Sequence, residues 1–176
     1  DKIDFKQLHA SEPEGNDGAI SPISALTIDE INDNFNKLHD AGLEAIRNGE
    51  VACVLLAGGQ GTRLGIDGPK GTLDVGLTKP LYVFQRQIEN LMDVTNEAGR
   101  CVPLLIMTSE INDGDTRKFF ADHDYFGYPK EKVFFFVQDM APATDLDGKI
   151  FLEEKDHVVL SPNGNGGWFQ SMNKAG

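Results

Sequence analysis

The stretch "LLAGGQGTRLGIDGPKGTLDVG", residues 55–76, decides the fold. It continues a short apolar run, residues 51–57, which is typical of a buried strand in a parallel sheet. Six glycines lie between residues 58 and 71, and Arg63 and Lys70 are the only cations of the stretch. A glycine-rich turn between a strand and a helix lets backbone N–H groups converge on phosphate oxygens. The stretch therefore predicts a phosphate or nucleotide site at the carboxyl end of the strand.

Two common phosphate-binding motifs do not match this loop. The dinucleotide fingerprint Gly-x-Gly-x-x-Gly, started from Gly59, requires a glycine where Leu64 stands. The P-loop requires Gly-Lys-Ser/Thr, whereas Pro69 precedes Lys70 and a glycine follows it. A loop with its own cations favours a ligand with several phosphate charges, because Arg63 can bind two oxygens and Lys70 supplies a point charge. The alternative is an ordinary set of turns with solvated cations.

Strands and helices alternate outward from this loop. Apolar spacing and short apolar runs predict a helix between residues 81 and 99, a strand at 102–108, a helix at 113–122 and a strand at 132–138. Their order predicts a Rossmann-like α/β fold, with a mostly parallel sheet flanked by helices. We expect a type I′ hairpin turn at Asp147-Gly148 and a last helix that starts after the glycines at 164–167.

The chain before the first strand predicts helices. Thr27 and Glu30 have the spacing of a capping box, and apolar residues at helical spacing place one or two helices within 29–48. We divide the chain into an amino-terminal helical lead-in, residues 1–48, and an incomplete nucleotide-binding α/β domain, residues 49–176. The chain begins without methionine and stops within a predicted helix, so we expect a piece of a longer protein.

Composition limits the partners. The formal net charge of −12 argues against nucleic acid and anionic membranes, because both are polyanions. No apolar run of about 18 residues and no secretory leader is visible, so the cytoplasm is the expected compartment. Cys53 and Cys101 lack metal-site spacing and are expected to be buried, reduced thiols. The four histidines are scattered without ligand spacing.

Three motifs carry a family resemblance. "LLAGGQGTRLG", followed by "GPKG" and "DVGL", resembles the nucleotide-binding signature of the uridylyltransferases that make UDP-sugars. Within them it is most similar to the eukaryotic-type UDP-N-acetylglucosamine pyrophosphorylases. Gln138, at the end of the third predicted strand, and "SPNGNGG" at 161–167 agree in order and spacing. The resemblance implies a GT-A-like nucleotidyltransferase that joins UTP and a sugar 1-phosphate, releases pyrophosphate and uses Mg²⁺.

The resemblance also implies site residues. Arg63 and Lys70 would neutralise the β- and γ-phosphates and are the implied catalytic residues. Gln138 would read the uracil edge, since its amide offers a donor beside an acceptor. The implied nucleotide contacts are Leu56, Ala57, Gly58 and Gly59 against uridine, Gly61 and Thr62 at the phosphates, and Asn165, Gly166 and Gly167 over the base and ribose.

The resemblance leaves part of the enzyme unassigned. In the family, the metal-supporting aspartate and the sugar contacts follow the glycine motif at 161–167, so we expect this part alone to be inactive. The metal ligands and the oligomeric state stay unknown. Two alternatives remain open: glucose or galactose 1-phosphate as the substrate in place of N-acetylglucosamine 1-phosphate, and a nucleotide-sensing module that does no chemistry in place of an enzyme. An NAD-binding domain is disfavoured by the broken fingerprint.

Overall fold

The computed structural model describes residues 22–176, which form two units. One unit contains Phe35–Asp139 and Pro162–Gly176, and we call it the loop unit because it holds the glycine loop. The other contains Met140–Ser161 together with the described residues up to Asn34. The boundary that we drew between residues 48 and 49 stays a prediction.

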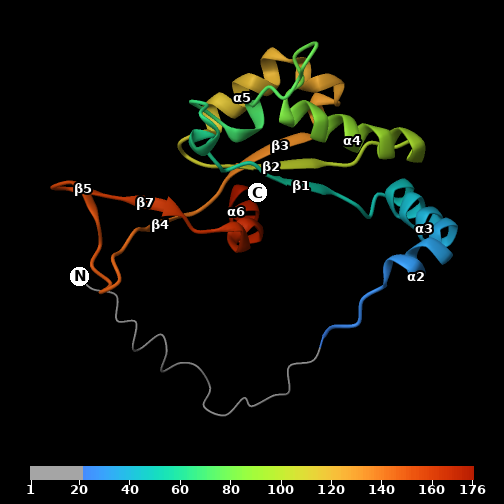
Figure 1. The fold of residues 1–176 in the computed structure, drawn as a ribbon, viewed down its shortest axis with the longest axis horizontal. Helices are drawn as coiled ribbons and strands as arrows, with labels where there is room; N and C mark the ends of the chain where they lie inside the picture. The colour runs from blue at the N-terminus through green and yellow to red at the C-terminus, as the bar shows by residue number, and fades with distance from the viewer. Residues whose placement is uncertain (1–21) are drawn as a thin grey trace. The chain divides into compact units, whose positions relative to one another are not determined.

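The loop unit is built on a parallel sheet of three strands (Figure 1). These are β1 (Cys53–Leu56), β2 (Leu104–Thr108) and β3 (Val133–Val137), in the order β1-β2-β3. Each strand starts directly opposite the start of its neighbour, so their carboxyl ends lie along one edge. The three predicted strands and their parallel direction are therefore confirmed.

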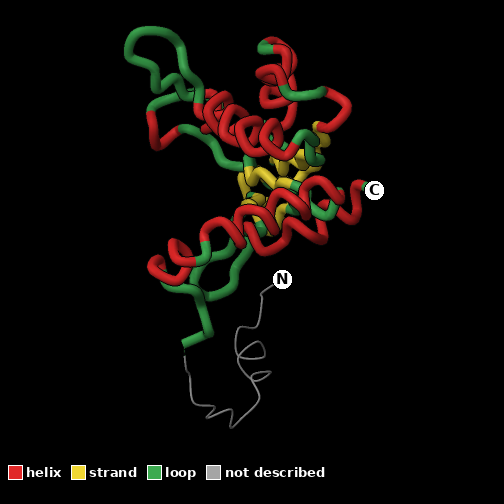
Figure 2. Tube along the Cα trace, turned by 90° about the vertical axis from the view of Figure 1, so that its right-hand side faces the viewer, coloured by secondary structure: helices red, strands yellow, loops and turns green. Residues whose placement is uncertain are grey.

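Helices cover both faces of this sheet, as Figure 2 shows for the loop unit. Helices α4 (Val83–Ala98) and α5 (Asp113–Asp122) lie over one face, and α6 (Trp168–Ala175) packs on the side of β3 that faces away from them. Helix α3 (Phe35–Asn48) packs against α4. Short 3-10 turns connect these elements: η1 (Thr62–Leu64), η2 (Lys70–Thr72), η3 (Asp124–Gly127), η4 (Lys130–Lys132) and η5 (Asn165–Gly167). None of the helices within residues 22–176 is long and apolar enough to cross a membrane.

The strands alternate between two apolar layers. Leu104 and Ile106 of β2 are buried in a core that Phe84, Ile88 and Phe120 from the helices complete. The neighbouring position, Leu105, faces the other layer, where it shares a groove with residues of β3 and α6. Both layers are apolar because a parallel strand is covered on its two faces, which explains the continuous apolar runs in the sequence.

The second unit contains α2 (Ile28–Asp33), the strand pair β4 (Met140–Pro142) and β7 (Leu160–Pro162), and the antiparallel pair β5 (Leu152–Glu154) and β6 (His157–Val158). The predicted capping box is confirmed at the start of α2. The Glu30 N–H donates to Thr27 Oγ1 at 3.2 Å, and the Thr27 N–H donates to Glu30 Oε2 at 2.7 Å.

The predicted turn at Asp147-Gly148 joins two antiparallel segments, as expected, but the prediction that it is a type I′ turn was wrong. Thr144 pairs with Ile150 across it, and Gly148 has a φ of 76°. Type I′ also requires a positive φ at Asp147, and the described non-glycine residues with positive φ are residues 124–126. The cause is Asp145, whose Oδ1 accepts the N–H groups of Asp147 and Lys149, each at 2.9 Å, and so fixes a longer loop.

The cysteines are less buried than we expected. Cys53 and Cys101 are both free and half-buried. Partial burial raises the pKa of the Cys53 thiol, because the thiolate loses hydration.

Candidate nucleotide site

Chain segments that follow the three parallel strands meet at the carboxyl edge of the sheet. The glycine loop leaves β1 at Ala57, whose N–H donates to the carbonyl of Met107 at 2.7 Å. Gln138 follows β3, and its N–H donates to the carbonyl of Thr108 at 2.8 Å. Ligands of open α/β sheets bind at this edge, so the topology places the glycine loop and Gln138 where a ligand is expected.

The loop closes on itself through main-chain hydrogen bonds. The Gly61 N–H donates to the carbonyl of Gly68 at 2.9 Å, and the Lys70 N–H donates to the carbonyl of Gly59 at 3.2 Å. Arg63 lies in η1 between these closures, and Lys70 lies at the base beside Gly59. Both cations and Thr62 are exposed. The loop therefore holds its two cations on one closed piece of backbone.

Four of the loop glycines are required by the loop itself. A Cβ at Gly61 would lie 2.1 Å from Ile66 Cγ1, and one at Gly71 would lie 2.1 Å from Phe84 Cε1. Gly65 and Gly68 have φ values of 73° and 137°, which side chains disfavour. Gly61 is buried, so the structure gives it a packing role, and its contact with phosphate stays a prediction.

Gly58 and Gly59 differ from these four. A Cβ at Gly58 would lie 2.4 Å from Gln138 Nε2, so the loop backbone touches the amide of Gln138. The residue Gln138 is 6% exposed, and its amide atoms are not among the buried side-chain atoms of the described chain that lack a hydrogen-bond partner. A Cβ at Gly59 would meet no atom within 4 Å, and Gly59 is exposed. The structure thus brings Gln138 to the loop and leaves open space over Gly59.

Asn112 is a residue of this site that sequence reasoning missed. Its Nδ2 donates to the carbonyl oxygens of Ala57 at 3.0 Å and Gly59 at 3.3 Å. Its Oδ1 accepts the N–H of Ser109 at 2.8 Å, and the residue is fully buried. The only sequence signal is an asparagine directly before a helix, which ordinarily indicates an N-cap. The side chain does not cap α5.

The glycines at 164–167 lead into α6, close to the end of β3. The Asn163 N–H donates to the carbonyl of Asp139 at 3.1 Å. Asp139 is also bound by α6, because its N–H donates to Ser171 Oγ at 3.1 Å and its carboxylate accepts from Lys174 Nζ at 2.6 Å. These bonds fix Asn163 and α6 beside Asp139, the residue that follows Gln138. No hydrogen bond joins residues 165–167 to the glycine loop among those of the described chain, so their place over the nucleotide stays a prediction.

A cavity of about 300 Å³ borders the glycine loop. Four of the predicted contact residues line it, namely Leu56, Ala57, Gly59 and Lys70. Gln138, Arg63, Thr62 and residues 165–167 are not among its lining residues. Leu55, Val83 and Phe84 make its walls largely apolar, which suits neither a triphosphate nor its counterions. We therefore place the candidate nucleotide site at Gly58, Gly59 and Gln138 rather than in this cavity.

Within residues 35–139 and 162–176, no three His, Cys, Asp or Glu side chains gather closely enough to share a metal ion. Asp74 Oδ1 accepts the N–H groups of Gly76 and Leu81, each at 2.9 Å, and these bonds hold the pKa of the carboxyl below its usual range. Asp74 therefore organises its own turn.

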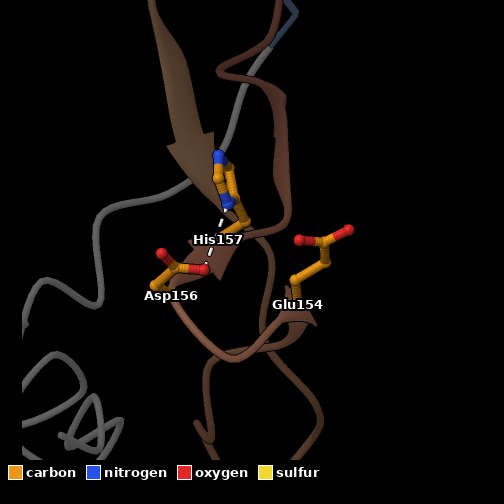
Figure 3. A group of neighbouring side chains, drawn as sticks. All are labelled: Glu154, Asp156 and His157. Carbon is orange, nitrogen blue, oxygen red and sulfur yellow. Dashed lines mark hydrogen bonds and ion pairs between the residues drawn. The ribbon is translucent and has the colours of Figure 1, made fainter.

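In residues 22–176, the one group with metal-ligand spacing is Glu154, Asp156 and His157 (Figure 3). It belongs to the second unit, and all three side chains are exposed. His157 Nδ1 lies 3.3 Å from Asp156 Oδ1. Exposed pairs of this kind are common on protein surfaces, so this contact does not require a bound metal ion.

Comparison with known proteins agrees with the α/β fold. The family described as UTP–glucose-1-phosphate uridylyltransferase matches residues 5–176. The chain is 42% identical to the UDP-N-acetylglucosamine pyrophosphorylase of Saccharomyces cerevisiae over 97% of its own length and 37% of that protein. The crystal structure of the uridine diphosphate N-acetylglucosamine pyrophosphorylase from Trypanosoma brucei superimposes with a TM-score of 0.76 at 34% identity, over 94% of this chain and 34% of that one.

A second solved structure, of a pyrophosphorylase from Entamoeba histolytica described as a putative UDP-N-acetylglucosamine enzyme, gives a TM-score of 0.77 at 32% identity, over 89% of this chain and 40% of that one. The chain thus spans between about a third and two fifths of the length of these relatives. The match of the family along nearly the whole sequence shows that the chain belongs to the UTP–glucose-1-phosphate uridylyltransferase family.

Proposed function

We propose that the protein to which this chain belongs is a uridylyltransferase that makes UDP-N-acetylglucosamine and pyrophosphate from UTP and N-acetylglucosamine 1-phosphate. The observation that carries the proposal is the contact between Gly58 and the side-chain amide of Gln138 at the carboxyl edge of a parallel sheet. The names of the relatives favour N-acetylglucosamine 1-phosphate over glucose 1-phosphate as the acceptor.

The amide of Gln138 supports uridine as the base. An uncharged amide pairs its acceptor and donor with the N–H and carbonyl of an imide, and it lies against the backbone of the loop. The residue is mostly buried, yet its amide atoms are not among the enclosed side-chain atoms that lack a hydrogen-bond partner, which leaves them accessible to a bound base. The main chain of residues 56–59 would lie beside the same uridine, and residues 165–167 would cover it.

The reaction needs charge cancellation more than proton transfer. An oxygen of the sugar phosphate is already anionic near neutral pH, so it attacks the α-phosphorus of UTP without a general base. The bond from the α-phosphorus to the bridging oxygen breaks, and pyrophosphate leaves with the electron pair. Arg63 and Lys70 would align and neutralise the two polyanions, which is the main contribution of proteins to phosphoryl-type transfers.

Magnesium remains a proposal without protein ligands. A divalent ion would supply further neutralisation of the phosphates. The described residues of the loop unit do not gather a set of carboxylates for it, and Asp74 is occupied by its own turn. We therefore assign no ligand and no step to the ion. A cytoplasmic location likewise rests on composition alone.

The test is pyrophosphate release by the full-length protein with UTP and Mg²⁺, run in parallel with the 1-phosphates of N-acetylglucosamine, glucose and galactose. We expect release with N-acetylglucosamine 1-phosphate at a kcat/KM at least about tenfold above the other two. Release with glucose 1-phosphate alone would keep the reaction and change the substrate. UTP binding with no release from any sugar phosphate would favour the nucleotide-sensing module.

A further inference from the structure

We propose that Asn112 is a positioning residue that holds the glycine loop in its nucleotide-binding shape. The inference rests on the proposed function, because it concerns the same site. Asn112 lies 53 residues from Gly59 in the sequence, at the start of α5, and one amide group reaches two carbonyls of the loop. These carbonyls belong to Ala57 and Gly59, on either side of the glycine that touches Gln138.

These two hydrogen bonds, together with the one that the Lys70 N–H donates to the Gly59 carbonyl at 3.2 Å, set the direction of the loop N–H groups. In a planar trans peptide, the carbonyl of one residue and the N–H of the next point in opposite directions. Because the carbonyls of Ala57 and Gly59 point to Asn112, the N–H groups of Gly58 and Gln60 point away from it. Neither N–H has a backbone partner among the described residues. Asn112 thus helps to turn two donors without a backbone partner away from itself, where an anionic or carbonyl oxygen of a nucleotide can accept them.

The local chemistry supports this role over that of an ordinary helix cap. An asparagine that caps a helix accepts an N–H of the first helical turn, but Asn112 Oδ1 accepts the N–H of Ser109, which precedes the helix. Its Nδ2 provides two donors, and each has a carbonyl acceptor in the loop. A fully buried amide with both ends bonded is a rigid connection between the end of β2 and the loop after β1.

The variant that isolates this connection is Asn112→Asp. Aspartate has nearly the same shape and still accepts from Ser109, but it cannot donate to Ala57 and Gly59 and repels their carbonyl oxygens. Asn112→Ser, which is small and neutral, repeats the test if the aspartate does not fold. The matched control is Thr116→Val, since Thr116 is equally buried on α5 and its hydroxyl has no hydrogen-bond partner in the described chain.

Two measurements on the full-length protein decide the proposal. Titration calorimetry with UTP should show binding weakened on the order of tenfold by Asn112→Asp and unchanged by Thr116→Val. Hydrogen exchange of the Gly61 and Lys70 amides, whose hydrogen bonds close the loop, should speed up on the order of tenfold in the Asn112 variants without nucleotide, while exchange in α4 stays as in the wild type.

The outcomes separate this inference from the proposed function. If the wild-type protein does not bind UTP, the proposed function is wrong, and the exchange rates alone decide whether Asn112 holds the loop. If the wild type binds UTP while folded Asn112 variants bind and exchange like Thr116→Val, Asn112 has no positioning role. Weaker UTP binding with an unchanged melting temperature, together with faster exchange confined to the loop, supports it.

Discussion

Replacing Gly71 by alanine tests the packing of the glycine loop on the core. A Cβ at this position would lie 2.1 to 2.3 Å from three carbons of the Phe84 ring. Carbon atoms pack at about 3.5–4.0 Å, so the ring would have to move by well over 1 Å. Phe84 is 3% exposed, and its ring centroid lies 5.0 Å from that of Phe120. The ring therefore has little freedom on the side of the core.

The expected cost follows from this geometry. Overpacking a core costs about 1–3 kcal/mol. The cavity of about 300 Å³ also borders Phe84 and Gly71 and gives the ring some space, so we expect the lower half of that range for the clash. Alanine also restricts the unfolded chain, which stabilises the folded state by about 0.4–1 kcal/mol and offsets part of the clash.

Gly59→Ala is the matched control, because it shares the unfolded-state effect without the clash. A Cβ at Gly59 would meet no atom within 4 Å, and its φ lies outside the left-handed region. The difference in the free energy of unfolding between the two variants therefore isolates the clash, and we expect about 1–2 kcal/mol. Urea unfolding of the full-length protein, followed by circular dichroism, measures it. A difference below about 0.5 kcal/mol, the range of ordinary surface substitutions, would refute the packing that we describe.

Three further predictions concern the site and the core. Arg63→Ala and Lys70→Ala should each lower kcat/KM for pyrophosphate release by about 10²–10³-fold. The control Lys118→Ala, on α5, should leave kcat/KM unchanged. Equal values of kcat/KM for all three variants would show that the loop cations do not act on the phosphates. Gln138→Ala should reduce the preference for UTP over CTP by about tenfold, and an unaltered preference in competition assays would remove its role in base recognition. Burial, with the charge of the nearby Cys101 thiolate, raises the pKa of Tyr128 to about 12. The stability that this raised pKa contributes is fully present below about pH 10 and is lost as the pH rises through about 12. Tyr128→Phe removes the group that titrates, so it should lessen alkaline unfolding between these pH values. Circular dichroism measured across this pH range checks the prediction.

The sheet could be predicted from the sequence because its signals are local. Strands covered on both faces are continuous apolar runs, and β1, β2 and β3 each lie within such a run. Gly99, with a φ of 74°, ends α4 where the sequence predicts it. The meeting of Gln138 with the loop followed from the family resemblance, and the structure adds the contact with Gly58.

Features decided by tertiary contacts could not be predicted. Asp124, Tyr125 and Phe126 all have φ values near 50°, although left-handed backbone is unfavourable for such residues. Tyr125 and Phe126 lie 6.4 and 5.7 Å from the ring of Phe120, so aromatic packing at the end of α5 offsets that cost. Asn112 is a similar case, since its partners are two carbonyls more than 50 residues away.

The arrangement of the loop also explains how an acidic chain can select a polyanion. With a formal net charge of −12, the chain as a whole repels a triphosphate, and the exposed side chains of Arg63 and Lys70 are screened by water and salt. Two solvated cations alone would give little selectivity. Backbone donors held in fixed directions need no reorganisation when a ligand arrives, so they discriminate by geometry. The closure of the loop by Gly61 and Lys70, and its attachment to Asn112, supply that rigidity. In the proposed enzyme, fixed backbone would therefore contribute selectivity for the nucleotide, and the two cations would contribute charge where the phosphates are expected.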